Sequence, residues 1–326
     1  MEKKYMNKKT LLSICIPTYN RAWYLEKCLK SIVSQDGFEN IEIVISDNCS
    51  CDNTEHIGRE YDSLYNNVHY FRNDKNLGDL NFPLAFQRAS GILRKLTNDT
   101  VIYKPGAIKY MLNVVKENVE NKPQVYFLSK GSSTTDSKTI ISLDDYIVTL
   151  SYNLTWICPI AIWEDDCEDL EIFVTNAESK LAQVPFLLNN FKKRGCAILY
   201  DHEIMNIQNV QKKNLSYGLY KVFYETFLDF IKPYVDKGEL SSASFEILRK
   251  DLLLNFFRGW VMKTELETDK YIFSEENLRD LVERAYKDEP YFGEYKKKLR
   301  RLIMKKKIKG VIKKIVNRFE FSKQIK

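Results

Sequence analysis

The sequence predicts an α/β fold, in which a mostly parallel sheet is flanked by helices and followed by a C-terminal helical region. Over the first hundred residues, short apolar runs alternate with stretches whose apolar residues recur at helical spacing. Residues 11–16 are apolar except for Ser13, as expected for a strand that is covered on both faces. From Tyr217 to Tyr286 the apolar spacing is helical throughout. Strands alternating with helices favour a parallel sheet, and the later pattern favours a separate helical region.

The individual elements follow from the same periodicities. The expected strands are residues 11–16, 41–45, 68–71, 92–96, 125–128 and 196–200. The expected helices are residues 21–34, a helix that starts at 52–55, and residues 80–89, 105–115 and 178–193. Short polar side chains can cap the free N–H groups of the second helix, and Pro105 suits a first helical turn. Residues 129–145 are rich in Ser, Thr and Asp and predict a loop. Breaks between the C-terminal helices are expected at Pro233, Gly238 and Thr268.

Composition and length exclude several classes of protein. The chain has 326 residues, of which 29% are charged and 44% are hydrophobic, as is ordinary for globular domains. No run approaches the roughly 18 apolar residues of a membrane span, and residues 1–9 lack the apolar core of a secretory signal. The seven cysteines predict no disulfide framework, and Cys49 and Cys51 stand too close together for a zinc pair. A cytoplasmic protein is therefore expected.

The net charge of +6 combines two regions of opposite sign. Residues 295–326 contain fourteen Lys or Arg and one acid, Glu320, whereas the remainder of the chain is acidic by seven charges. Apolar residues recur in this tail at three-and-four spacing, at Ile308, Val311, Ile312, Ile315, Val316 and Phe319. A basic amphipathic helix of this kind predicts binding to an anionic membrane surface. A helix that packs on its own domain is the alternative, and nucleic acid is not expected because aromatic residues are sparse.

Three loops are expected at the carboxyl ends of the parallel strands, where such sheets bind ligands: residues 17–21, 46–53 and 97–104. The chain lacks both the G-x-G-x-x-G turn and the G-x-x-x-x-G-K loop that hold phosphates in other nucleotide-binding proteins. A nucleotide would therefore be held by side chains at the strand ends. Asp47 would accept a hydrogen bond from a pyrimidine N3–H in that case. The alternative is that Asp47 and Asn48 simply form a turn.

Several blocks in the first 110 residues resemble the family-2 glycosyltransferases, whose fold is called GT-A. The blocks are Ser13-Ile14-Cys15-Ile16-Pro17-Thr18-Tyr19-Asn20-Arg21, Ile43-Val44-Ile45-Ser46-Asp47-Asn48, Asn76-Leu77-Gly78, Ala89-Ser90-Gly91 and Lys104-Pro105-Gly106-Ala107. Their order is that of the family, and an ordered set of blocks is far more specific than any one of them. The sequence Ile45-Ser46-Asp47-Asn48 is most similar to the corresponding motif of the branch that adds sugars to bacterial capsule and O-antigen polysaccharides.

The resemblance implies a Rossmann-like GT-A domain and a nucleotide-sugar donor, with a UDP-sugar expected first and a dTDP-sugar next. The acceptor it implies is a lipid-linked or growing polysaccharide. The nucleotide-binding residues carried over from the family are Pro17, Thr18, Tyr19, Asn20, Arg21, Asp47, Asn48, Asn76, Gly78, Lys95 and Asn98. The domain boundaries that follow are 1–128 for the nucleotide-sugar-binding half, 129–215 for the acceptor-side half, 216–293 for the helical region and 294–326 for the basic tail.

The family also implies a divalent cation, Mg²⁺ or Mn²⁺, held by a D-x-D motif against the donor diphosphate. This chain has Thr97-Asn98-Asp99-Thr100 at that position, and two registers are open. Either Asn98 and Thr100 stand in place of the paired acids, or Asp99 is the sole remaining acid, so Asp99 and Thr100 are the candidate metal ligands. A hard cation takes at least one carboxylate, which Asp99 alone would supply, together with oxygens from phosphate and water. In the alternative, Lys95, Arg94 or Lys104 meets the charge of the leaving diphosphate.

An inverting transferase of this family needs a carboxylate as general base, and Glu178 matches the expected place at the start of a helix before a glycine and a strand. Asp165 and Asp166, within the acidic run that starts at Glu164, are the competing candidates. His202 is expected to be structural.

The predicted function is thus an inverting glycosyltransferase at the inner face of the plasma membrane. The alternative is a non-catalytic glycan or nucleotide binder with a degenerate metal motif. The aromatic residues of the helical region predict core packing or a homodimer.

Overall fold

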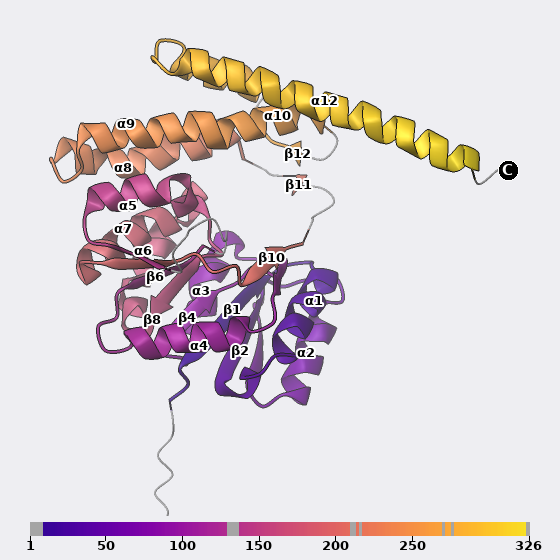
Figure 1. Cartoon of the computed structure of the whole chain (residues 1–326). Coiled ribbons are helices and arrows are strands. Elements are labelled where there is room, and N and C mark those ends of the chain that lie inside the picture. The colour runs from indigo at the N-terminus through magenta and orange to yellow at the C-terminus, as the bar shows by residue number, and fades with distance from the viewer. Residues whose placement is uncertain are drawn as a thin grey trace, which may run out of the picture. The chain divides into compact units, whose positions relative to one another are not determined.

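The computed structural model describes residues 9–128, 137–208, 213–214, 217–268, 271–274 and 277–323, with side chains in the last helix described as far as Ile308. It contains two compact units, Met1–Val210 and Gln211–Lys326 (Figure 1). The first unit holds the strands of both halves that the sequence predicts, 1–128 and 129–215, as far as residue 210. The second unit holds the predicted helical region and the basic tail.

A mixed sheet runs through the first unit. In the described part of the chain it has eight strands, which lie in the order β3 (Val68–Arg72), β2 (Ile41–Asp47), β1 (Leu12–Thr18), β4 (Leu93–Leu96), β8 (Ile160–Trp163), β6 (Gln124–Phe127), β9 (Ala197–Tyr200) and β7 (Ser137–Ile140). The first four are parallel to one another, β8 is antiparallel to both its neighbours, and β6 and β9 are again parallel. The predicted α/β class with a mostly parallel sheet is confirmed.

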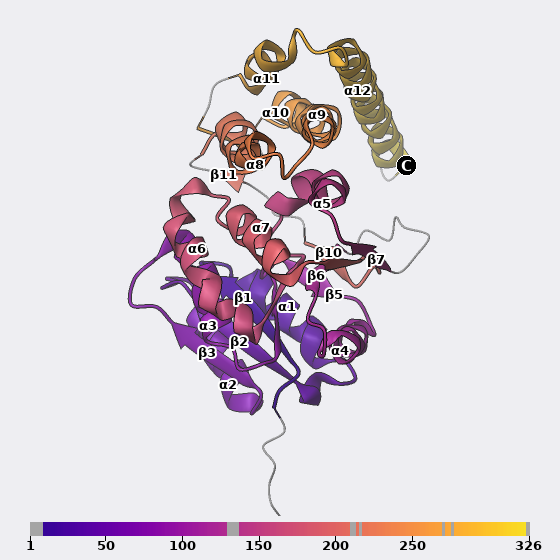
Figure 2. The same cartoon turned by 90° about the vertical axis from the view of Figure 1, so that its left-hand side faces the viewer.

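Helices cover both faces of this sheet (Figures 1 and 2). They are α1 (Ala22–Val33), α2 (Thr54–Leu64), α3 (Asn81–Gln87), α4 (Ala107–Asn118), α5 (Leu143–Leu150), α6 (Leu170–Thr175) and α7 (Gln183–Arg194). Alternate residues of each strand face opposite ways, so one strand shows which helices share a face. In β6, Val125 belongs to the core that includes α1, α2 and α4. Its neighbour Gln124 donates to the Leu187 carbonyl at 2.9 Å, which places α7 on the opposite face.

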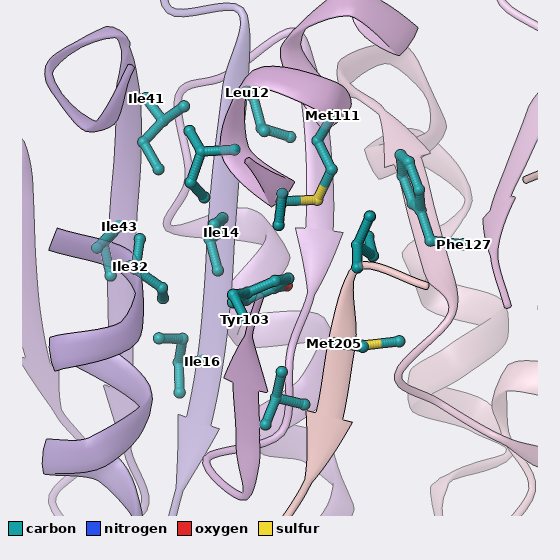
Figure 3. Close-up of a cluster of buried hydrophobic side chains, with 14 of the residues drawn as sticks. Leu12, Ile14, Ile16, Ile32, Ile41, Ile43, Tyr103, Met111, Phe127 and Met205 are labelled. Carbon is teal, nitrogen blue, oxygen red and sulfur yellow. The ribbon is translucent and has the colours of Figure 1, made fainter. Parts of the chain in front are cut away.

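The core beneath α1 and α4 consists of aliphatic side chains from the parallel strands. Ile14 and Ile16 of β1 are fully buried, as are Ile32 of α1 and Met111 of α4. Figure 3 shows these side chains gathered between the strands and the helices that cover them. Burial on both faces explains why the strands read as continuous apolar runs. The sheet is therefore a rigid support for the loops that follow β1, β2 and β4.

A predicted loop and a predicted helix of the first unit are wrong in detail. The predicted loop 129–145 contains strand β7 and the start of α5, whose N-cap Ser142 accepts a hydrogen bond from the Asp145 amide; residues 129–136 lie outside the described part. The predicted helix 178–193 begins later, at Gln183, because Lys180 has a left-handed backbone with φ of 65°. Glu178 lies instead in the short 3₁₀ turn η5 (Ala177–Ser179).

Smaller elements complete the first unit. Strand β5 (Val101–Tyr103) pairs antiparallel with β10 (Met205–Ile207), and neither strand was expected. Helix α4 starts at Ala107, after Gly106 with φ of 85°, so Pro105 precedes the helix and does not lie in its first turn as predicted. The other 3₁₀ turns are η1 (Phe38–Asn40), η2 (Gly78–Leu80), η3 (Ser151–Thr155) and η4 (Glu164–Asp169).

The second unit is helical, as predicted. Its elements are the π-helical turn η6 (Lys221–Thr226), α8 (Phe227–Asp236), α9 (Ser242–Asp251), the π-helical turn η7 (Leu252–Phe257), α10 (Arg258–Leu266), α11 (Leu278–Tyr286) and α12 (Phe292–Lys323), with a short parallel pair β11 (Lys213–Asn214) and β12 (Tyr271–Ile272). The break expected at Pro233 is wrong, since Pro233 lies inside α8. The helix continues through it because Phe227, Leu228 and Ile231 pack into the core on one face.

The basic tail forms helix α12, which begins in the core of the second unit. Tyr295 and Leu299 are buried, whereas Met304 and Ile308 are 62% and 53% exposed. The side chains of Val311, Ile312, Ile315, Val316 and Phe319, on which the predicted apolar face depends, lie outside the described part. Within the described residues, no helix combines the length and the apolar character that a membrane crossing requires.

Candidate active site

The order in which the chain adds strands to the sheet reverses at β1. The carboxyl end of β1 is therefore the expected place for a ligand. The chain runs outward from β1 through β2 to β3 and then returns to form β4 on the other side of β1. In such sheets ligands bind in the crevice beyond the carboxyl ends of the strands, where the order reverses. Thr18 ends β1 beside Asp47 of β2, and the Thr97 amide after β4 donates to the Cys15 carbonyl at 2.8 Å.

A hollow of about 380 Å³ lies at this place. It is lined by Pro17, Thr18, Tyr19, Arg21, Asn48, Asn76, Gly78, Asp79, Asn81, Phe82, Asn98 and Asp99. The structure thus brings together nine of the residues that the family resemblance implied: Pro17, Thr18, Tyr19, Arg21, Asn48, Asn76, Gly78, Asn98 and Asp99. Asn20, Asp47, Lys95 and Thr100 do not line it. Asp79, Asn81 and Phe82 line it without having been predicted.

The loops after β1 and β2 are tied together, which fixes one wall of the hollow. Asn20 adopts a left-handed backbone with φ of 51°, a conformation that asparagine tolerates better than most residues. Its amide donates to Ser50 Oγ at 2.8 Å, and its side-chain oxygen accepts from the Cys51 amide at 2.7 Å. Asp52 accepts from the amides of Ala22 and Thr54, both at 3.0 Å, and so caps the starts of α1 and α2.

Asp47 lies beneath these loops and is fully buried. One carboxylate oxygen accepts from Ser50, through its amide at 3.0 Å and its hydroxyl at 2.5 Å. The other accepts from the Tyr70 hydroxyl at 2.6 Å and from Arg72 at 2.8 Å. Tyr70 reaches this place because Gly58 has no side chain; a Cβ there would lie 2.2 Å from the ring. In this arrangement Asp47 supports the loop instead of facing the hollow.

A network of amide side chains shapes a further part of the wall. Asn48 donates to Asn76 Oδ1 at 2.8 Å and accepts from the Leu77 amide at 2.8 Å. Asn73 donates to Asn48 Oδ1 and to Asn81 Oδ1, both at 3.0 Å. The network holds the loop before α3 against the end of β2. Asn73 and Asn81 were not singled out from the sequence, although the density of asparagine between residues 66 and 81 is a signal that could have drawn attention to them.

Lys95, which was expected near the phosphates, lies inside the sheet and is fully buried. Its ammonium group donates to the Leu96 carbonyl at 2.6 Å and to the Cys158 carbonyl. Burial lowers the pKa of Lys95 from its ordinary value of 10.5 to about 8. The structure therefore does not bring this lysine to the hollow, and its charge acts on stability.

Replacing Lys95 by methionine is expected to change how stability depends on pH. Between about pH 8 and 10.5 the unfolded chain binds more protons at this lysine than the folded chain does, so Lys95 makes the free energy of unfolding rise as the pH increases through that window. Lys95→Met lacks this rise. Denaturant unfolding at pH 7 and pH 9.5 measures it, with Lys109→Met, at an exposed position, as the control. An equal pH response in both variants would contradict the prediction.

Asp99 is the carboxylate of the stretch aligned with the family's metal motif, and it is 3% exposed. Its Oδ2 atom accepts from the Thr18 hydroxyl at 2.9 Å, and its Oδ1 atom accepts from the Arg21 guanidinium at 3.1 Å. Burial raises the pKa of Asp99, and the Arg21 charge opposes that shift.

Thr100, the other candidate metal ligand, is buried and does not line the hollow. Among the described residues, no three His, Cys, Asp or Glu side chains form a group that would bind a metal ion. These residues do not fit the oxygen-rich ligand set of Mg²⁺ or Mn²⁺.

Glu178 is exposed in turn η5, which packs against η2 (Gly78–Leu80) at the rim of the hollow. Lys180 strengthens this contact, since its ammonium lies 3.2 Å from Asp79. The competing acids have structural partners: Asp165 and Asp166 pair with Arg194 at 2.8 and 2.5 Å, and Asp166 is fully buried.

His202, which was expected to be structural, is exposed, and its ring stacks on Tyr110 at 4.7 Å. This stacking lies on α4, away from the residues that line the hollow.

Fold and site together define a class. The mixed sheet, its reversal at β1, and a polar hollow at the strand ends that has no glycine-rich phosphate loop are the features of a GT-A-type α/β domain.

The comparison with known families agrees. The family model described as Glycosyl transferase family 2 matches residues 13–136, which is less than half of the chain. The chain is 49% identical over 84 residues to the abequosyltransferase RfbV of Salmonella typhimurium, covering 25% of each chain. It is 32% identical over 108 residues to the GalNAc(5)-diNAcBac-PP-undecaprenol beta-1,3-glucosyltransferase of Campylobacter jejuni, covering 32% of this chain and 35% of the relative. The matches span between a quarter and about a third of these relatives.

Solved structures share the fold at low sequence identity. TarS 1–349 of S. aureus in complex with UDP has a TM-score of 0.56 and 18% identity, over 79% of this chain and 76% of TarS 1–349. The mannosyltransferase PcManGT of Pyrobaculum calidifontis, in complex with GDP-Man and Mn²⁺, has a TM-score of 0.52 and 14% identity, over 90% and 85% of the two chains. Identities this low show the GT-A fold and leave donor and acceptor to be inferred.

Proposed function

We propose that this protein is an inverting glycosyltransferase that moves a sugar from a nucleotide-sugar, with a UDP-sugar as the first candidate, to a lipid-linked or growing bacterial surface glycan. The observation that carries the proposal is the hollow at the ends of β1 and β4. It presents amide, hydroxyl and guanidinium groups at the point where an α/β sheet of this order binds ligands. The likeness to the abequosyltransferase and to the UDP complex of TarS supports the same activity.

The proposed reaction is a single displacement at the anomeric carbon of the donor. The acceptor oxygen forms a bond to that carbon while the bond to the diphosphate breaks, and the electron pair of the broken bond stays on the diphosphate oxygen. Glu178 takes the proton of the acceptor hydroxyl. Its position supports this role, because η5 packs against η2 at the rim of the hollow and the Glu178 side chain is exposed.

A panel of nucleotide-sugars tests the proposal. The 326-residue protein is titrated with UDP-, GDP- and dTDP-sugars in a calorimeter, with and without Mg²⁺ or Mn²⁺, and donor consumption is then followed with lipid-linked acceptors. Binding and transfer of one donor are expected. Failure to bind any of these donors would overturn the proposal. Binding without transfer to any acceptor would favour the alternative, a non-catalytic binder on the same fold.

The acceptor and the place of action are inferred from two further features. The curated relative from Campylobacter jejuni is named for an acceptor linked to undecaprenol diphosphate. In this chain the exposed lysines Lys305, Lys306 and Lys307 stand beside exposed Met304 and Ile308 on α12. A basic surface with adjacent apolar residues favours the headgroup layer of an anionic membrane. We therefore infer that α12 binds the inner face of the plasma membrane, where a lipid-linked acceptor would lie.

Neutralising these three lysines to glutamine is expected to weaken binding to vesicles that contain phosphatidylglycerol. Each lysine near an anionic surface contributes about 1 kcal/mol, so the triple variant should bind about a hundredfold more weakly. Co-sedimentation with such vesicles, and with phosphatidylcholine alone, measures the difference. The control replaces three exposed lysines elsewhere, Lys109, Lys116 and Lys232. Equal losses in the two variants would show that α12 is not the membrane contact.

A further inference from the structure

Arg21 is the only basic residue among the described residues that line the hollow. Its side chain is 42% exposed, and one terminal nitrogen lies 3.1 Å from Asp99 Oδ1. A guanidinium carries five N–H donors in a planar fork, so a single bond to Asp99 leaves further donors for a ligand. Planar forks of this kind bind phosphate oxygens in pairs. The hollow therefore contains one positive group that is suited to a diphosphate.

The other cations that the sequence offered for this role lie elsewhere. Lys95 is buried and donates to two carbonyl oxygens. Arg94 donates to the carbonyl oxygens of Gly91 and Phe86 at 3.1 and 2.8 Å. Lys104 pairs with Glu203 at 2.8 Å. None of the three lines the hollow. Among the described residues that line the hollow, the positive charge available to the leaving diphosphate is thus that of Arg21.

Asp99 also has its oxygen atoms engaged. Oδ1 accepts from Arg21 and Oδ2 from Thr18, and the carboxylate is 4% exposed. A metal ion on Asp99 would have to displace the guanidinium or bind beside a fixed positive charge, and both arrangements cost free energy. The second residue of the motif position, Thr100, is buried and does not line the hollow. The donor set therefore favours a guanidinium over a divalent cation at this position.

We propose that Arg21, held in place by Asp99, takes the role of the divalent cation and binds the donor diphosphate without a metal. This inference rests on the proposed function and names how its site holds the donor. When the bond between the sugar and the diphosphate breaks, negative charge grows on the leaving oxygen, and a positive group already in position stabilises it without reorganisation. Asp99 acts as a positioning residue, which orients the guanidinium through the bond to Oδ1.

Calorimetric titration with UDP tests the proposal directly. The wild-type protein is expected to bind UDP with the same affinity in EDTA and in excess MnCl₂. Arg21→Gln should bind UDP about 10- to 100-fold more weakly in EDTA, since it loses charge-assisted hydrogen bonds. Lys104→Gln, which removes a lysine that does not line the hollow, is the matched control and should bind like the wild type. Circular dichroism and thermal melting establish whether each variant folds. If Arg21→Gln does not fold, Arg21→Lys, which keeps the charge, is titrated in its place.

Two further measurements separate the guanidinium from a metal. Asp99→Asn should keep most of the UDP affinity if Arg21 binds the diphosphate, and should lose it if Asp99 holds a metal. Electron paramagnetic resonance of free Mn²⁺ should show no uptake of the ion by the wild-type protein with UDP. Stoichiometric Mn²⁺ uptake, or UDP binding that requires Mn²⁺, would overturn the inference and leave the proposed function standing. Absence of UDP binding under all conditions, together with binding of no other nucleotide-sugar, would instead overturn the proposed function.

Discussion

Replacing Glu178 by glutamine is expected to lower the rate of sugar transfer by about 10²- to 10⁴-fold, the range that a positioned general base contributes. Glutamine has the size of glutamate but cannot take the acceptor proton. Since Glu178 is exposed in turn η5 and does not line the hollow, UDP binding and thermal stability should stay unchanged. Steady-state transfer kinetics, combined with UDP titration of the same preparation, measure both quantities.

Two variants control for the position of the charge. Glu168→Gln removes an exposed carboxylate from the neighbouring η4 turn and should transfer at the wild-type rate. Asp165→Asn tests the competing acid, which pairs with Arg194, and should affect stability more than transfer. A fall in transfer with Asp165→Asn and none with Glu178→Gln would show that Glu178 is not the base.

The second large effect is expected at Asp47, whose replacement by alanine should destabilise the fold and open the loop wall of the hollow. Ser50 and the Tyr70 hydroxyl lose their acceptor in this variant. Buried donors left without a partner cost about 1–3 kcal/mol each, so we expect a loss of about 2–4 kcal/mol in the free energy of unfolding. Urea denaturation measures this loss.

The same variant should weaken UDP binding indirectly. Asp47 holds Ser50, and Ser50 Oγ accepts from the Asn20 amide, so the loop that carries Tyr19 and Arg21 loses its support. Asp36→Ala, at an exposed position of the first unit, is the control and should change stability by less than about 0.5 kcal/mol. If Asp47→Ala lost UDP binding at unchanged stability, Asp47 would contact the base directly, as the family resemblance implied.

Most of the first unit could be predicted from local patterns in the sequence. Strand β1 and helix α1 were expected within two residues of their observed bounds, because a buried strand and an amphipathic helix each leave a periodic trace. The shift of α7 to Gln183 was not predictable in the same way. A left-handed Lys180 carries no sequence signal of the kind that glycine provides, and the helix starts only after it.

The candidate site was predictable as a set of loops but not as a set of contacts. Thr18 ends a buried strand, and Asn48 and Asn98 follow buried strands; the parallel order of these strands was enough to bring the three residues to one edge. Lys95 shows the limit of this reasoning. It stands in a strand that ends at the same edge, yet its side chain is enclosed between two backbone carbonyl groups. Whether a polar residue of a strand faces a ligand or the interior depends on what packs over it.

The amino-acid sequence alone was sufficient for the fold class, for the likeness to family-2 glycosyltransferases over residues 13–136, and for the edge of the sheet at which the polar loops meet, because these depend on periodicity and on short ordered motifs. The partners of the charged groups came only from the folded chain. Arg21 meets Asp99 across 78 residues, and Asp47 meets Arg72 across 25, through the register of parallel strands and the return of the chain to β4. No local pattern encodes such pairs, since the free energy of a buried charge depends on the groups that tertiary packing places beside it.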